Sequence, residues 1–121
     1  MKFQARKEGP LTIVKLTGSM VGGPVADEFR EFMLKLVEDG ARRVILDLTQ
    51  VPYVASPGVG MIVGAQASLA NRGGELRVAI ATERVKNLFH IIRLARMIRV
   101  FEGLQEAIDS FPRTSKLYAK A

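Results

Sequence analysis

Ser56 is the residue of this 121-residue chain whose neighbours most clearly suggest chemistry. Residues 44–46 are apolar and predict a buried strand that ends at Asp47, and residues 51–54 predict a second short strand. Ser56 and Pro57 then turn the chain into a helix. Ser56 suits the N-cap, where its hydroxyl can accept a hydrogen bond from a free backbone N–H, and Pro57 suits the next position. Negative charge is favoured at such a helix N-terminus, so this serine is the first candidate for function.

The other reactive side chains give little support for catalysis. His90 is the only histidine and the chain has no cysteine, so nothing orients a serine nucleophile and no clustered set of metal ligands exists. We expect His90 to be a packed or half-exposed helix residue. The glycines at positions 18, 22 and 23 lack the Lys-Ser/Thr ending of a phosphate-binding P-loop. The sequence therefore predicts a protein that is not an enzyme and needs no metal or cofactor.

Composition predicts one small globular domain. Hydrophobic residues make up 48% of the chain and charged residues 25%, which is typical of a folded protein with a single core. No apolar run reaches the ~18 residues that a transmembrane helix needs, and the N-terminal residues show no hydrophobic signal segment. We expect a cytoplasmic protein with one domain over residues 1–112 and a basic, flexible tail over 113–121.

Strand and helix patterns alternate along the chain. Strands at 3–7 and 11–17 flank a Glu-Gly-Pro turn and predict a hairpin. The further predicted elements are a helix from Pro24 to Gly40, a strand at 44–47, a helix at 57–72, a strand at 76–81, a helix at 83–94, a strand at 98–101 and a helix at 104–111. This order predicts an α/β fold with a mostly parallel central sheet and an N-terminal hairpin.

The segment from Arg43 to Gln66 resembles the STAS domain and, within it, the anti-sigma factor antagonists. In that group the turn typically reads DSSGLG, and a kinase-type anti-sigma factor phosphorylates a serine in it. Residues 55–60 read ASPGVG here, so one serine and two glycines match, while the acid and the second serine are replaced. Residues 18–21 read GSMV where the family often has GELD. The resemblance covers most of the chain and implies a STAS-like fold, with about four helices packed mainly on one face of the sheet.

Two interpretations of Ser56 remain open. As an N-cap, its hydroxyl would stabilise the helix by ~1 kcal/mol. As the phosphorylation site that the resemblance implies, it would carry close to two negative charges at the positive end of a helix, which the fold can tolerate. The same charges would repel an acidic or apolar partner surface and so could act as a switch. The two missing carboxylates count against phosphorylation.

A protein partner is the binding partner that the resemblance implies, either an anti-sigma factor with serine kinase activity or a phosphatase. The residues predicted to contact it are Met20, Val21, Gly22, Ser56, Pro57, Gly58, Met61 and Ala65. Small side chains on this helix face would let a partner backbone approach closely, and an exposed methionine adapts to many surfaces. The alternative is that the same face packs under a neighbouring helix of the domain.

The charge distribution predicts a basic surface. The net charge is +6, and Glu83 is the only acid between residues 83 and 101. The basic residues assigned to this surface are Arg84, Lys86, Arg93 and Arg96, with Arg99 beside them. They form either a solvated helix face or a surface that attracts an acidic partner or an anionic lipid. Nucleic acid is not expected, because the chain has no tryptophan and two tyrosines for base stacking.

Three function classes follow from these patterns. The first is a regulatory protein, similar to an anti-sigma factor antagonist, that binds a switch kinase and is controlled at Ser56. The second is a STAS subunit that assembles constitutively in a lipid-transport or stress-signalling complex, without a phosphorylation cycle. The third is nucleotide or anion binding at the helix N-terminus that carries Ser56.

Overall fold

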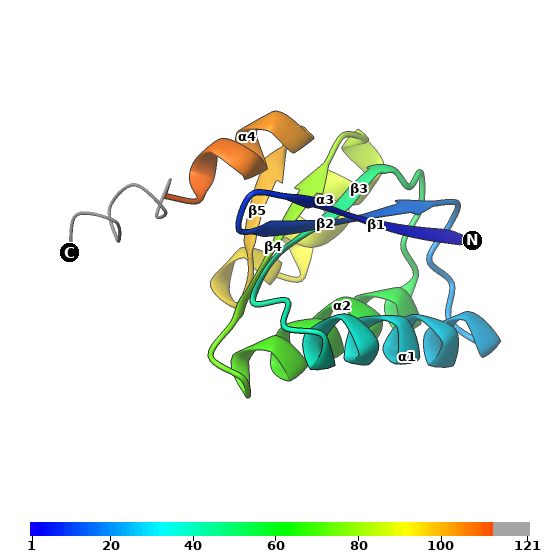
Figure 1. Cartoon of the computed structure of the whole chain (residues 1–121). Coiled ribbons are helices and arrows are strands. Elements are labelled where there is room, and N and C mark those ends of the chain that lie inside the picture. The colour runs from blue at the N-terminus through cyan, green and yellow to red at the C-terminus, as the bar shows by residue number, and fades with distance from the viewer. Residues whose placement is uncertain (113–121) are drawn as a thin grey trace.

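Residues 1–112 are described in the computed structural model of the chain, and the predicted tail at 113–121 lies outside the described residues. One five-stranded sheet has the strand order β1-β2-β3-β4-β5 (Figure 1). The elements in chain order are β1 (Lys2–Glu8), β2 (Leu11–Thr17), α1 (Pro24–Glu38), β3 (Arg43–Gln50), α2 (Ser56–Ala70), β4 (Glu75–Ile80), α3 (Glu83–Ile91), the 3-10 helix η1 (Leu94–Arg96), β5 (Arg99–Glu102) and α4 (Leu104–Ser110).

The sheet confirms the predicted topology. β1 and β2 form an antiparallel hairpin that turns at Gly9, where φ is 59°. β2 to β5 are parallel neighbours, and in the middle of the sheet Leu46 of β3 lies between Val14 of β2 and Val78 of β4. Parallel strands need crossover connections, and the helices between β2 and β5 provide them.

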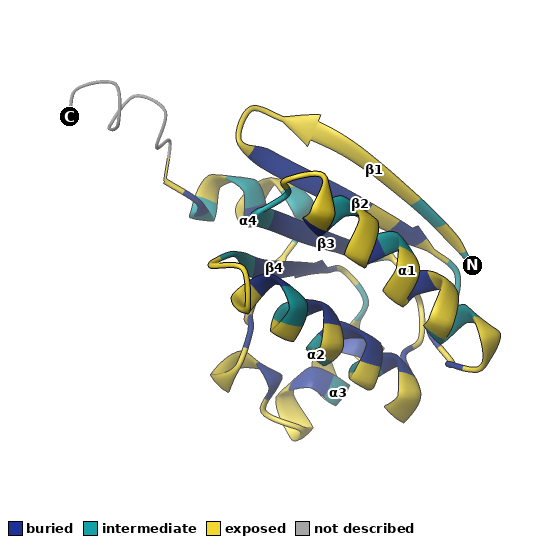
Figure 2. Ribbon diagram, turned by 60° about the horizontal axis from the view of Figure 1, so that its bottom comes forward, coloured by how far each residue is buried: buried dark blue, intermediate teal, exposed yellow. Residues whose placement is uncertain are grey.

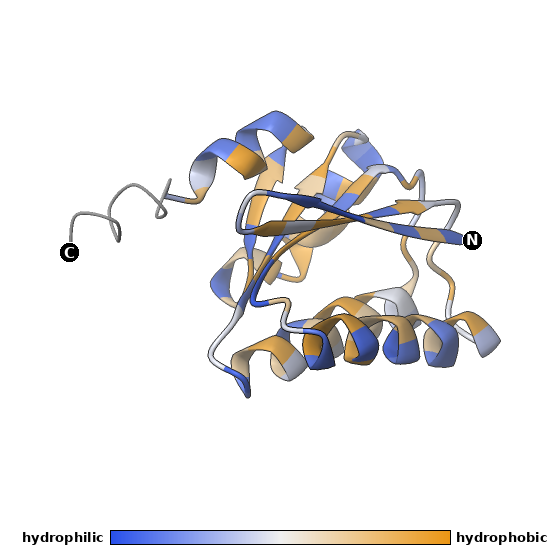
Figure 3. Cartoon of the chain, viewed as in Figure 1, coloured by the Kyte–Doolittle hydropathy of each residue, from blue (hydrophilic) through white to orange (hydrophobic). Residues whose placement is uncertain are grey.

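Helices cover the two faces of the sheet unequally. α1 and α2 lie on one side of the sheet and α4 on the other (Figure 1), while α3 contributes Val85 and Phe89 to the core beneath α1 and α2. This three-helix face also buries Leu46, Ile62 and Leu69 completely. The predicted arrangement, with the helices mainly on one face, is therefore confirmed, and Figures 2 and 3 show the central strands as both buried and apolar.

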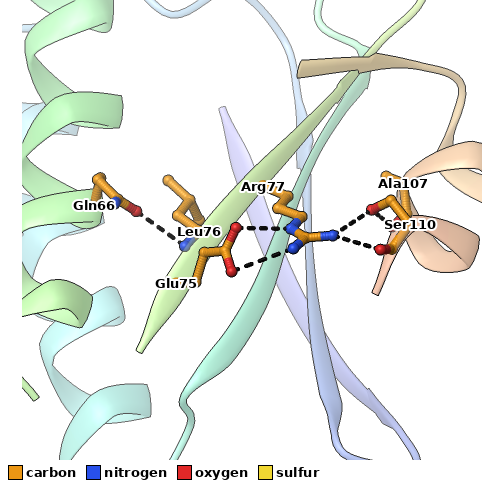
Figure 4. Close-up of polar contacts among 6 residues, drawn as sticks. All are labelled: Gln66, Glu75, Leu76, Arg77, Ala107 and Ser110. Carbon is orange, nitrogen blue, oxygen red and sulfur yellow. Dashed lines mark hydrogen bonds and ion pairs between the residues drawn. The ribbon is translucent and has the colours of Figure 1, made fainter. Parts of the chain in front are cut away.

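The second face has a smaller core, and a buried arginine fastens α4 to it (Figure 4). Arg77 of β4 donates from Nε to Glu75 (2.8 Å) and from one terminal nitrogen to the backbone oxygen (2.6 Å) and hydroxyl (2.9 Å) of Ser110. Its guanidinium also lies 3.9 Å from the centre of the Phe111 ring. Because the buried charge is fully engaged by these groups, Arg77 links β4 to the end of α4.

Three predicted elements differ from the structure by three residues or more. The strand predicted to end at Asp47 continues as β3 to Gln50. Residues 51–54 form no strand but a single bridge between Met20 and Val54. The third helix ends at Ile91 rather than at residue 94, because Arg93 adopts a left-handed backbone (φ 56°, ψ 41°) that an α-helix cannot contain. The short helix η1 follows, and its buried Leu94 returns the chain to the core.

Candidate functional site

The loop after β2 and the turn before α2 are bonded to each other. The backbone N–H of Met20 donates to the oxygen of Tyr53 (2.9 Å), and the N–H of Ala55 donates to the oxygen of Met20 (2.9 Å). This pairing continues the sheet by one isolated parallel bridge beyond the ends of β2 and β3. Both segments leave the carboxyl ends of parallel strands, which is the edge where α/β sheets usually place their sites.

Two glycines let these segments approach closely. A Cβ on Gly58 would overlap the oxygen of Met20 and lie 2.8 Å from the Met20 Cβ. Gly22 has φ 91°, and a Cβ there would lie 2.5 Å from the Cβ of Pro57. Neither position can hold a larger residue without moving backbone, so the start of α2 is rigidly supported.

Ser56 is the first helical residue of α2, not its N-cap. Ala55 occupies the N-cap with extended backbone (φ −91°, ψ 171°), and its oxygen accepts the first helical hydrogen bond from Val59 (3.1 Å). The predicted cap is therefore wrong by one residue, because the bond from Ala55 to Met20 keeps Ala55 extended. Among the described residues the Ser56 hydroxyl has no hydrogen-bond partner, and the residue is exposed.

Ser56 opens into a hollow between α2 and α3. The hollow has a volume of about 320 Å³ and is lined by Tyr53, Val54, Ala55, Ser56, Arg84, Asn87, Leu88 and Ile91. Arg84 lies with its guanidinium carbon 4.8 Å from the centre of the Tyr53 ring. No carboxylate is among the lining residues, so an anion in the hollow would meet a positive charge and no like charge.

Most of the predicted partner-binding face is buried. Met20, Gly58, Met61 and Ala65 are inaccessible to a partner, and Gly22 is buried as well. Met61 and Ala65 face Phe29 and Met33 of α1, so of the two alternatives the face packs under a neighbouring helix. The expected exposure of these residues is therefore wrong.

Three residues of the predicted partner-binding set reach the surface. They are Val21, whose exposed fraction is 52%, Ser56 and Pro57. Pro57 lies against Gly22, the residue that follows Val21, so the loop and the start of α2 present one continuous surface. This exposed part of the site is smaller than the sequence suggested.

Sequence reasoning did not connect Ser56 with Tyr53, Arg84 and Ile91. The available signal was the strand order, because β3 and β4 are parallel neighbours and the segments after them must meet at one edge of the sheet. Arg84 was assigned only to a general basic surface. The structure places it in the hollow that Ser56 lines.

The predicted basic surface is not uniform. Lys86 donates to Glu102 (3.1 Å), and this hydrogen bond is the main cause of a raised pKa for Lys86, helped by the charges of Glu102 and Glu83. Arg93 and Arg96 are exposed and have no ion-pair partner within residues 1–112. The basic character therefore lies mainly after α3, not along it.

Metal and membrane-spanning features are absent from the described part of the chain. Residues 1–112 hold no group of three or more histidine, cysteine or acidic side chains that could bind a metal ion. His90 is exposed on α3 and does not line the Ser56 hollow. Within the same residues, every helix is too short or too polar to cross a bilayer.

Known families and relatives agree with this geometry. The family model for the STAS domain matches residues 2–107. An anti-sigma-B factor antagonist of Staphylococcus aureus is 31% identical over 78 residues, which amount to 64% of this chain and 72% of the relative.

Two solved structures share the fold. The Bacillus cell fate determinant SpoIIAA in its phosphorylated form has a TM-score of 0.67 at 19% identity, covering 89% of this chain and 97% of that one. A sulfate transporter family protein from Wolinella succinogenes has a TM-score of 0.73 at 21% identity, covering 94% of this chain and 91% of that one. With the family match and the Staphylococcus relative, the conclusion is direct: the chain belongs to the STAS domain family, among the anti-sigma factor antagonists.

Proposed function

We propose that this protein is a cytoplasmic regulator that binds an anti-sigma factor of the switch-kinase type, through a surface formed by Val21, Ser56 and Pro57. The observation that carries the proposal is the state of Ser56, whose hydroxyl is exposed and unbonded at the first position of α2. Membership of the anti-sigma factor antagonists supplies the class of partner. The buried glycine contacts beneath the surface keep it in one shape.

Phosphorylation of Ser56 would switch this binding by charge alone. The close contacts of Met20 with Gly58 and of Gly22 with Pro57 hold the start of α2 in one position. A phosphate would therefore add close to two negative charges at a fixed place, next to free N–H groups of the helix and in a hollow that contains Arg84. The fold tolerates the modified state, while an acidic or apolar partner surface is repelled.

A constitutive binding module is the second candidate function, and one observation favours it. The hollow at Ser56 contains no carboxylate, whereas the family's turn usually begins with an acid that Ala55 replaces here. A STAS subunit held in a larger assembly would need the same exposed surface but no modified serine. The solved sulfate transporter family protein shows that the fold also occurs outside anti-sigma factor antagonists.

The decisive experiment combines phosphorylation and binding. The purified protein is incubated with ATP and, in turn, with each switch-type serine kinase encoded in the same genome, and intact mass is measured. Gain of one phosphate by the wild type and none by Ser56→Ala is the expected result. Ser68→Ala, at a half-buried serine on the same helix, is the matched control and should still gain the phosphate.

Binding of the same kinases is then measured with unmodified protein, with phosphorylated protein and with Val21→Asp. The regulatory proposal expects binding by the unmodified wild type and weak binding by the other two. Stable binding without any phosphate transfer would replace it with the constitutive module. Absence of both binding and phosphorylation would overturn the proposal.

A further inference from the structure

The turn between α3 and β5 carries apolar and basic side chains together at the surface. We propose that this α3–β5 turn, residues 91–97, binds the surface of an anionic membrane. The partner is the phospholipid headgroup layer, and the protein lies on it without crossing it. The turn borders the Ser56 hollow through Ile91 and shares no residue with the Val21–Pro57 surface. The proposal does not depend on phosphorylation of Ser56.

Three large apolar side chains of the turn are exposed. The exposed fraction is 75% for Ile91, 59% for Met97 and 40% for Ile92. Their neighbours Leu94 and Ile98 are buried, so the turn is anchored to the core and its remaining side chains must point outward. Three large exposed apolar side chains within one seven-residue turn are the kind of feature that marks an interaction surface.

Along the chain, the charges beside these apolar residues have one sign. Arg93 and Arg96 belong to the turn and Arg99 begins β5, and the sequence contains no acid from residue 84 to residue 101. Glu102, the next acid along the chain, is paired with Lys86. Exposed apolar residues that alternate along the chain with arginines and no acids are the combination that inserts into the headgroup region of anionic lipid.

Arg93 adds an observation of its own. It is the only residue other than glycine within 1–112 with a positive φ, and it sits just after α3, where glycine commonly ends a helix. Glycine would adopt this backbone at lower cost. The turn therefore keeps an arginine at a position where glycine would make the fold more stable.

Charge decides among the occupants that could cover the turn. A second copy of this chain that met the turn with its own turn, as in a symmetric dimer, would bring arginines against arginines. The C-terminal residues beyond 112 include Arg113, Lys116 and Lys120, so the sequence gives the tail the same sign. A bilayer can accept an exposed turn without offering it a matching pocket. The turn lies at the β5 edge of the sheet, and α3 lies on the side of the molecule away from β1 (Figure 2).

Vesicle co-sedimentation tests the proposal with the full chain. One set of vesicles contains phosphatidylcholine alone, and the other contains phosphatidylcholine with phosphatidylglycerol. The wild type should sediment with the second set, not with the first, and added salt should weaken binding. Arg93→Gly combined with Arg96→Gln should lower the affinity roughly thirtyfold.

Three further variants separate specific binding from the general attraction of a basic protein. Lys2→Gln with Lys7→Gln removes the same charge from the opposite edge strand β1 and should keep nearly all binding. Met97→Ser removes an apolar contact without changing charge and should weaken binding. Arg93→Gly alone should bind the vesicles more weakly while melting at an equal or higher temperature. Its weaker binding therefore cannot come from unfolding.

Two results would overturn the proposal. One is failure of the wild type to bind the phosphatidylglycerol vesicles. The other is equal loss of binding in the turn variant and in the β1 variant, which would show that net charge alone attracts the protein. If the turn variant instead loses a switch kinase identified by the phosphorylation experiment, while the wild type ignores vesicles, the turn is a protein-docking surface.

Discussion

The two faces of the sheet are stabilised by different interactions. The three-helix face is closed mainly by apolar side chains, with Leu46, Ile62 and Leu69 completely buried between the sheet and its helices. One polar contact is added by Gln66 of α2, whose side-chain oxygen accepts a hydrogen bond from the N–H of Leu76 (2.9 Å). The α4 face has a small apolar cluster and is completed by the buried charge of Arg77. The site at Ser56 is supported by the first face, and this explains how a short exposed surface can have a fixed shape.

Alternation along β3 divides the two cores. Successive side chains of a strand point to opposite faces, so Ile45 enters the α4 core while its neighbour Leu46 enters the three-helix core. Both residues are completely buried, which makes them a matched pair. The contributions of the two cores to stability can therefore be compared by substituting these two adjacent residues.

Truncation of Leu46 should have the largest effect. We expect Leu46→Ala to lower the free energy of unfolding by about 3–5 kcal/mol and Ile45→Ala by about 2–3 kcal/mol, because the cavity under three helices has more surrounding atoms that lose contacts. Urea denaturation monitored by circular dichroism measures both. An equal or larger loss for Ile45→Ala would contradict the ranking of the two cores.

Addition of one methyl group at Gly58 should have the next largest effect. Gly58→Ala forces a Cβ into the backbone of Met20, and we expect a loss of about 2–3 kcal/mol. Gly60→Ala is the control two residues later, where a Cβ has open space, and should gain about 0.5–1 kcal/mol from helix propensity. If both variants had the same stability, the close contact between the loop and α2 would be refuted.

Much of the fold was predictable from sequence, because the signals were local. The bounds predicted for β2 match the structure, and helix 104–111 differs by one residue from α4. Hydrophobic alternation and turn residues determine such elements without distant contacts. The order of strands and helices then specified the parallel sheet.

The details of the site were not predictable, because they depend on contacts between distant segments. The N-cap lies at Ala55 because its N–H bonds to Met20, thirty-five positions earlier by residue number. α2 carries small or apolar residues on nearly every side, so periodicity could not identify which face α1 covers. The end of α3 was misplaced because a left-handed arginine gives no sequence signal.

Removal of the Arg77 charge should have a smaller, local effect. We expect Arg77→Met to cost about 2 kcal/mol, since the Ser110 oxygens lose a donor while Glu75 remains partly exposed to water. Amide hydrogen exchange should speed up in α4 and stay unchanged in α1 and α2. Uniform loss of protection across all helices would show that Arg77 supports the whole fold rather than one face.

The smallest expected change in stability comes from comparing Thr82, which caps a helix, with Ser56, which does not. Thr82 caps α3 by accepting a hydrogen bond from the N–H of Val85, at a long distance of 3.4 Å. Thr82→Ala should therefore cost about 0.5–1 kcal/mol, the lower part of the range for caps. Ser56→Ala removes no cap and should change stability by less than about 0.5 kcal/mol, as for other exposed positions. Thermal denaturation of both variants decides the matter: if Ser56→Ala destabilised the protein as much as Thr82→Ala, Ser56 would be a structural cap in solution. A neutral result leaves the hydroxyl of Ser56 without a structural role, which is the condition that the proposed phosphorylation requires.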